Sequence, residues 1–157
     1  MNESPDAIYS VVSPRSNAAG SPGDFPVEDV PLADLQRRCR AAVDAGARMQ
    51  FVYAWYPETA DDPELRYVLH PAAGHPPQLW RCRPGTDSPP SLAAIAPLLS
   101  WYEREITDLC GITFRDQPQP GPHVLLPGAK VERPPLIPGP APAVSYTPEP
   151  LDRKSVV

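Results

Sequence analysis

Two carboxylates lie two residues apart in this chain, at Glu103 and Glu105, and paired carboxylates are a common arrangement for acid–base catalysis. The surrounding sequence predicts a helix, on which residues i and i+2 point to different faces. The two side chains are therefore not expected to act on one substrate. No other feature of the sequence indicates a shaped pocket around an acid with a shifted pKa. We do not expect the chain to be an enzyme on its own.

Three cysteines, Cys39, Cys82 and Cys110, are the other residues whose type suits a metal site. They are far apart and form no C-x-x-C pair, whereas zinc and iron–sulfur sites usually have closely spaced ligands. An odd number of cysteines in a chain without a secretory signal predicts reduced, mostly buried thiols. We therefore expect this chain to bind no metal or redox cofactor.

A third candidate is a helix face formed by Trp101, Arg104, Glu105 and Asp108, which are spaced at i, i+3, i+4 and i+7. Two interpretations of this face stay open. It is either a solvated face with an Arg104–Asp108 ion pair worth a few tenths of a kcal/mol, or a protein interface, since tryptophan and arginine are typical of binding hot spots. The residues alone favour the solvated face, because charged helix faces are common.

The segment that positions all these residues is 100–114, with the sequence SWYEREITDLCGITF. Ser100 and Glu103 have the spacing of a capping box at a helix start. Gly111 suits the left-handed position just after a helix end. Beyond it, residues 112–114 alternate as a strand does. The helix also carries an apolar stripe that is expected to face the core, formed by Tyr102, Ile106, Leu109 and Cys110.

The preceding hundred residues predict one helix and three strands. Helical spacing of apolar residues predicts a helix over 31–46, whose arginines we interpret as a solvated face rather than a phosphate site. Strands are predicted at 49–55, 65–70 and 78–83, forming an antiparallel meander on that helix, with the strand aromatics in the core. Trp80 and Cys82 share one face of the third strand. The predicted fold class is α+β: a small, mostly antiparallel sheet packed with two to three helices.

Length and composition indicate one domain with proline-rich ends. The chain has 157 residues, of which 25 are proline, and a net charge of −5 without a basic cluster, which argues against nucleic acid as a partner. No apolar run is long enough to span a bilayer. We predict a disordered segment at 1–26, a folded domain at 27–126 and a proline-rich tail at 127–157. The tail is expected either to lie extended across a partner or to be disordered.

The string WYEREITDLCGITF resembles the signature of the 30 kDa subunit family of respiratory NADH dehydrogenase. Related modules occur in membrane-bound nickel–iron hydrogenases and formate hydrogenlyase. Cys110 replaces the usual phenylalanine. Ile137 and Pro138 stand where the family has basic residues, so the chain lacks the side chains of one docking contact of the family. The residues that match the signature are Trp101, Tyr102, Glu103, Arg104, Glu105, Asp108, Leu109, Gly111 and Ile112.

This resemblance implies a non-catalytic structural subunit of a membrane-associated oxidoreductase complex. It implies docking through the signature residues on a large subunit, of the 49 kDa or hydrogenase type, beside a small iron–sulfur subunit. Any nickel–iron, iron–sulfur, NADH or quinone site would then lie in those partners, and this chain would bind none. The complex would hold the chain at the cytoplasmic face of the inner membrane, as a peripheral protein.

Two questions about function stay open at this point. The short length and the altered tail slightly favour the hydrogenase-type complex over NADH dehydrogenase. The alternative to a complex subunit is a stand-alone adaptor of the same fold, binding a partner through the Trp101/Arg104 face and the proline-rich tail.

Overall fold

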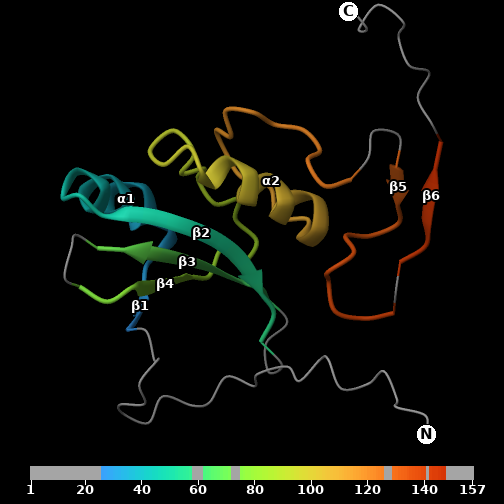
Figure 1. Cartoon of the computed structure of the whole chain (residues 1–157). Helices are drawn as coiled ribbons and strands as arrows, with labels where there is room; N and C mark the ends of the chain where they lie inside the picture. Colours follow the sequence, from blue (N-terminus) through green and yellow to red (C-terminus); the bar gives the residue numbers. More distant parts are fainter. Residues whose placement is uncertain (1–25, 58–61, 72–74, 126–128, 141, 148–157) are drawn as a thin grey trace, which may run out of the picture.

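The computed structural model describes residues 26–57, 62–71, 75–125, 129–140 and 142–147 (Figure 1). The predicted disordered segment falls almost wholly outside these ranges, as do the last ten residues of the predicted tail. The described part is an α+β fold with two α-helices, a four-stranded sheet and a separate two-stranded sheet. No helix in these ranges is long and apolar enough to cross a membrane.

The first helix forms where apolar periodicity predicts it. A 3-10 turn at Leu32–Asp34 leads into α1, Leu35–Asp44. Leu35 and Cys39, four residues apart, are both fully buried, which fixes the face that the helix turns to the core. The chain leaves the helix through Gly46, whose positive φ of 90° glycine adopts without strain.

Four strands form the main sheet in the order β1-β4-β3-β2. The predicted antiparallel meander β2-β3-β4 is confirmed, and the sequence missed β1, which pairs parallel to β4. A strand of three residues is too short to show a period of two, so its alternation carries no signal. The four strands are β1 Val27–Asp29, β2 Arg48–Trp55, β3 Glu64–His70 and β4 Gln78–Cys82.

One face of this sheet makes the core, and both α1 and α2 (Leu99–Cys110) lie over it (Figure 1). Trp80 and Cys82 share this face, as predicted, and both are buried. The other buried residues of the strands are Met49, Val52, Leu65, Tyr67 and Leu69.

The expectation that the aromatics of β2 enter the core is wrong for the alternating residues Phe51, Tyr53 and Trp55. The pairing of β2 with β3 shifts between Met49 and Phe51, which marks an irregularity of the β-bulge type. Such a shift reverses which later residues point inward, so Met49 and Val52 are buried while Phe51 is 38% exposed. Tyr53 and Trp55 are half-buried.

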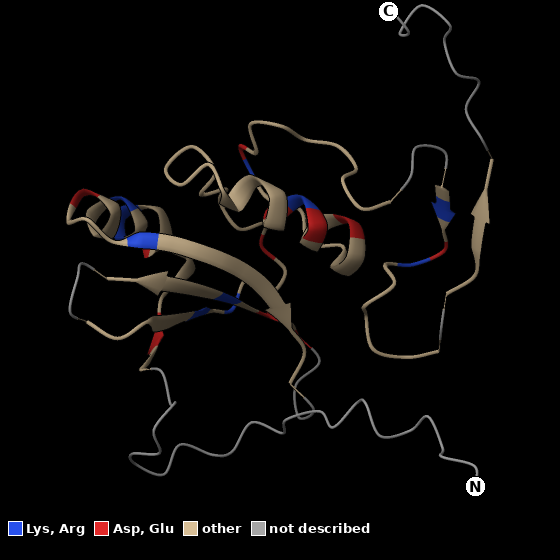
Figure 2. Ribbon diagram, in the orientation of Figure 1, with Lys and Arg blue, Asp and Glu red and all other residues tan. Residues whose placement is uncertain are grey.

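Ion pairs lie on the open face of the sheet, and Figure 2 shows positions of both charges close together along its strands. Asp29 accepts two hydrogen bonds from Arg81 and pairs with Arg83, and Glu64 pairs with Arg66 and Arg83. The Arg81 guanidinium is the main cause that lowers the pKa of Asp29. Because these arginines are engaged by carboxylates, the described residues of this face do not form a basic patch of the kind that binds phosphates.

The chain after α2 lacks the strand predicted at 112–114 and later forms a separate pair of strands. Residues 112–114, predicted as a strand, make no ladder; a single bridge joins Pro90 to Arg115. Pro89 and Pro90 lack the N–H groups that a ladder needs, which stops the pairing. In the tail, β5 (Ala129–Val131) and β6 (Val144–Tyr146) pair only with each other within the described ranges.

Candidate functional site

Helix α2 carries most of the signature residues, and its end is built around Gly111. That glycine has a φ of 73°, the predicted left-handed conformation, and its N–H donates to the carbonyl of Thr107. A Cβ atom at this position would lie 2.7 Å from Cγ of Pro134. Glycine is therefore required twice, for the backbone turn and for the close approach of the tail.

The start of α2 differs from the prediction, because Ser100 and Glu103 do not form a capping box. The helix begins at Leu99, and no side chain caps it. Ser100 Oγ donates instead to Oε1 of Gln117, at 3.2 Å. Glu103 is fully buried and bonds to a different segment, so it does not reach back to the helix start.

The Glu103 carboxylate joins three segments of the chain. Its oxygens accept hydrogen bonds from Ser91 Oγ (2.6 Å), the Leu92 N–H (2.7 Å) and Gln117 Nε2 (2.6 Å). Burial raises the pKa of this carboxyl, while the bonds from Ser91 and Leu92 act in the opposite direction. Glu105, two residues on, is exposed, so the two carboxylates face different surroundings. Glu103 thus holds the segments before and after α2 in place.

Arg104 and Asp108 do not pair with each other; both hold the loop at 121–125. Arg104 donates to the carbonyl of Gly121 at 3.2 Å and to that of Pro122 at 2.9 Å. Asp108 Oδ2 accepts from three consecutive backbone N–H groups, those of residues 123, 124 and 125, at 2.7, 2.8 and 3.2 Å. The Arg104–Asp108 ion pair that belonged to the solvated-face interpretation therefore does not form. Both side chains bond to the loop and not to each other, because the loop offers several backbone donors and acceptors in fixed positions.

This loop completes an exposed apolar cluster, which we name the α2 patch. Trp101 is 59% exposed and packs edge-to-face on His123, with ring centroids 4.5 Å apart. Leu98, which lines one hollow together with Trp101 and His123, is 51% exposed. The α2 patch consists of Leu98, Trp101 and His123. Sequence reasoning identified Trp101 but missed the other two, since nothing in the sequence shows that the loop folds back onto the helix.

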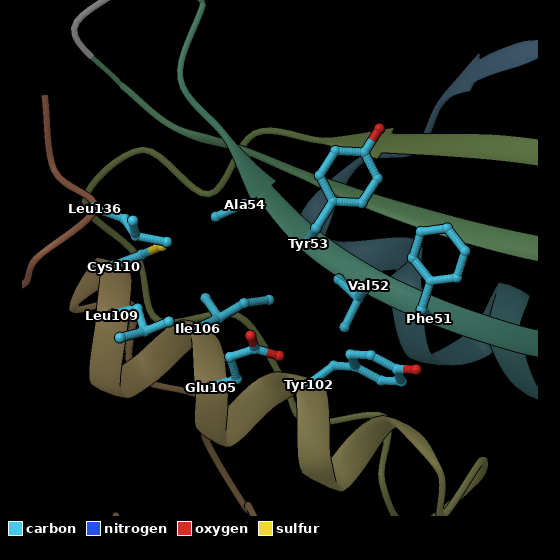
Figure 3. Close-up of a pocket in the computed structure, with 10 residues that line it drawn as sticks. All are labelled: Phe51, Val52, Tyr53, Ala54, Tyr102, Glu105, Ile106, Leu109, Cys110 and Leu136. Carbon is cyan, nitrogen blue, oxygen red and sulfur yellow. The ribbon is translucent and has the colours of Figure 1, made fainter. Parts of the chain in front are cut away.

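A groove lies beside the patch, between α2 and β2 (Figure 3). Its volume is about 220 Å³, and most of its lining is apolar. Tyr102 and Glu105 line both this groove and a hollow at the α2 patch, so the two are neighbours. The residues that line the groove are Phe51, Val52, Tyr53, Ala54, Tyr102, Glu105, Ile106, Leu109, Cys110 and Leu136.

The three cysteines lie in the interior, on α1, on β4 and at the end of α2. All are free and buried, as the sequence predicts. Burial raises the pKa of Cys39 and Cys82 to about 11. In the part of the chain that the structure describes, no three His, Cys, Asp or Glu side chains are grouped so that they could hold one metal ion.

Comparisons with known proteins agree with this fold. Residues 30–137 match the family described as respiratory-chain NADH dehydrogenase, 30 Kd subunit. A chain of the membrane-bound sulfane sulfur reductase, an archaeal respiratory membrane complex, superposes with a TM-score of 0.54 at 19% identity. The match covers 62% of this chain and 61% of that one, so this chain spans less than two thirds of its length.

A second structure, the trypsin-resistant fragment 1–134 of Nqo5, superposes with a TM-score of 0.50 at 16% identity. That match covers 59% of this chain and 80% of the fragment. At such identities the two superpositions show a shared fold. No curated protein matches the chain.

Proposed function

The chain belongs to the family of the 30 kDa subunit of respiratory-chain NADH dehydrogenase, and from this premise we propose that it is a non-catalytic structural subunit of a membrane-associated oxidoreductase complex. The complex is of the NADH:quinone oxidoreductase or energy-converting hydrogenase type. Within it, the chain docks on the large catalytic subunit and lies near the small iron–sulfur subunit. Redox centres and substrate sites belong to those partners, and the complex keeps the chain at the cytoplasmic face of the membrane.

The α2 patch is the observation that carries this proposal. An exposed tryptophan grouped with Leu98 and His123 is typical of protein interfaces, where large aromatic side chains supply much of the binding energy. The patch is also rigidly supported, because Arg104 and Asp108 fix the loop that carries His123. A surface that is ordered before binding loses less conformational entropy when a partner covers it.

Recovery of the complex from solubilised membranes tests the proposal. A tagged chain should retain the large subunit and the iron–sulfur subunit, identified by mass spectrometry. Trp101→Ala should leave the melting temperature of the isolated chain nearly unchanged, because the side chain is mostly exposed, and should weaken assembly by about 2 kcal/mol or more.

Val27→Ala is the control, since Val27 is an exposed apolar side chain (39%) on β1, an element that contributes nothing to the patch. The control should assemble as the wild type does. Recovery of a partner without any redox subunit would replace the proposal with the stand-alone adaptor.

A further inference from the structure

The strand β2 leaves one side of its backbone without a partner. It is the last strand in the order β1-β4-β3-β2, and it pairs only with β3. Among the described residues, no backbone hydrogen bond joins its other side to another segment. An edge of eight residues presents N–H and C=O groups on which a further strand can form.

The groove runs along this free edge. Four consecutive residues of β2, at 51–54, line it, although alternate side chains of a strand point to opposite faces. All four can reach one groove only where it follows the edge of the strand itself. The opposite wall is a single face of α2, because Tyr102, Glu105, Ile106 and Leu109 are spaced at i, i+3, i+4 and i+7 (Figure 3).

The residues that line the groove also indicate the charge of a segment that could bind there. Glu105 is the one acidic residue among those that line the groove, it is exposed, and no ion pair engages it within the described ranges. The ring of Phe51 lies 6.0 Å from that of Tyr53 and 6.2 Å from that of Tyr102, between centroids. A carboxylate beside aromatic rings favours a lysine or arginine side chain, through charge and cation–π attraction.

One end of the groove is closed by the chain's own tail. Leu136 lines the groove there, and its N–H donates to the carbonyl of Leu109 at 2.8 Å. An entering segment therefore lies between this end and the α2 patch, next to the surface that we assign to docking.

We infer that this groove binds an extended segment of a partner subunit, added to the sheet as a further strand along β2. Its backbone pairs with β2, its apolar side chains fill the groove, and a lysine or arginine lies against Glu105. Strand addition of this kind takes its affinity from main-chain hydrogen bonds and its selectivity from side-chain pockets. The inference rests on the proposed function for the source of the segment, and it adds a second site that adjoins the α2 patch.

Hydrogen exchange on the purified complex tests it. We compare the full-length chain, free and in the complex, and expect the backbone amides at 51–54 that point away from β3 to exchange at least about tenfold more slowly in the complex. Glu105→Lys should weaken binding of the partner by about tenfold, because it places like charges together. Asp44→Lys is the matched control, an exposed acid reversed on α1, and should bind as the wild type does.

The outcomes separate this inference from the proposed function. A complex that forms while residues 51–54 exchange as fast as in the free chain overturns strand addition and leaves the proposed function standing. Equal binding by Glu105→Lys and Asp44→Lys overturns the role of Glu105. A wild-type chain that recovers no redox subunit at all overturns both proposals.

Discussion

At the scale of single residues, Glu103 shows how a family signature serves the fold. A fully buried carboxylate with three donors is costly to bury and costly to remove, because its loss would leave the donors at residues 91, 92 and 117 unsatisfied. The neighbouring Glu105 is exposed and has no such partners in the part of the chain that the structure describes. Two acids of one signature thus have different tasks, one inside the chain and one on its surface.

Glu103 should make stability fall as pH rises. Burial raises the pKa of its carboxyl above the ordinary value of 4.5, so the folded chain binds this proton more tightly than the unfolded chain does. The free energy of unfolding should decrease between about pH 4.5 and the raised pKa, by up to about 1.4 kcal/mol per pH unit, and be constant above it. Glu103→Gln should remove this decrease, as measured by urea unfolding at a series of pH values.

Glu105→Gln is the control for that series and should keep the wild-type slope. Asp29 contributes in the opposite sense, because Arg81 lowers its pKa and the stability it supplies is lost as pH falls. Subtracting the mutant curve from the wild-type curve cancels Asp29 and isolates Glu103. Parallel curves for wild type and Glu103→Gln would contradict the assignment.

Arg104 holds the loop that contributes His123 to the α2 patch. Arg104→Ala removes two charge-assisted hydrogen bonds to the carbonyls of Gly121 and Pro122, and should lower the unfolding free energy by about 1 kcal/mol. Assembly should suffer more, by about 2 kcal/mol or more, because the loop that carries His123 is released. Thermal melting and native-gel recovery of the complex measure the two effects. Arg40→Ala is the control, because Arg40 is an exposed arginine on α1, and it should change neither quantity. If Arg104→Ala assembles fully, Arg104 serves only the stability of the chain.

At the scale of elements, local patterns predicted the fold wherever one segment carried enough information. Apolar periodicity located both helices, alternation located three strands, and Gly111 marked the end of α2. Apart from the missed β1, which is too short to show a period, the errors involve a second segment. The bulge in β2 depends on its pairing with β3, the bridge at Arg115 depends on prolines at 89 and 90, and Glu103 bonds to residues before and after its helix. A pattern read along one segment does not contain such partners.

The junction of α2 with the tail should be sensitive to a single methyl group. Gly111→Ala strains a positive φ and brings a carbon atom to 2.7 Å from Pro134 Cγ, so we expect a loss of about 2–3 kcal/mol in unfolding free energy. Gly85→Ala has a comparable φ of 57° with no atom within 4 Å, and should lose only about 1 kcal/mol. Chemical denaturation of both variants measures the difference.

Adding Pro134→Ala to Gly111→Ala should recover part of the loss, since it removes the Cγ atom that clashes. Equal losses for the variants at 85 and 111 would show that the tail does not press on the end of α2.

At the scale of the whole molecule, the described chain is a layer of two helices on one face of a sheet. Most of the charged side chains of the signature bind other segments of the same chain. The signature residues divide between the interior, at Glu103, the loop anchors, Arg104 and Asp108, and the exposed Trp101. The sequence alone grouped them on one helix but could not separate these tasks, because each depends on a segment that folds back from elsewhere. Such an arrangement suits a subunit that presents surfaces to partners.

The isolated chain should therefore be colourless and free of metal, whereas the complex should contain iron. The cysteines lie on three different elements, and burial raises the pKa of Cys39 and Cys82 to about 11, so the thiolates that bind zinc or iron are scarce at neutral pH. Elemental analysis of the purified full-length chain should find iron, nickel and zinc each well below one atom per chain. The same analysis of the recovered complex should find iron supplied by its partners. Stoichiometric metal in the isolated chain, retained after dialysis against a chelator, would contradict the assignment of the redox centres to other subunits and give this chain a chemical role of its own.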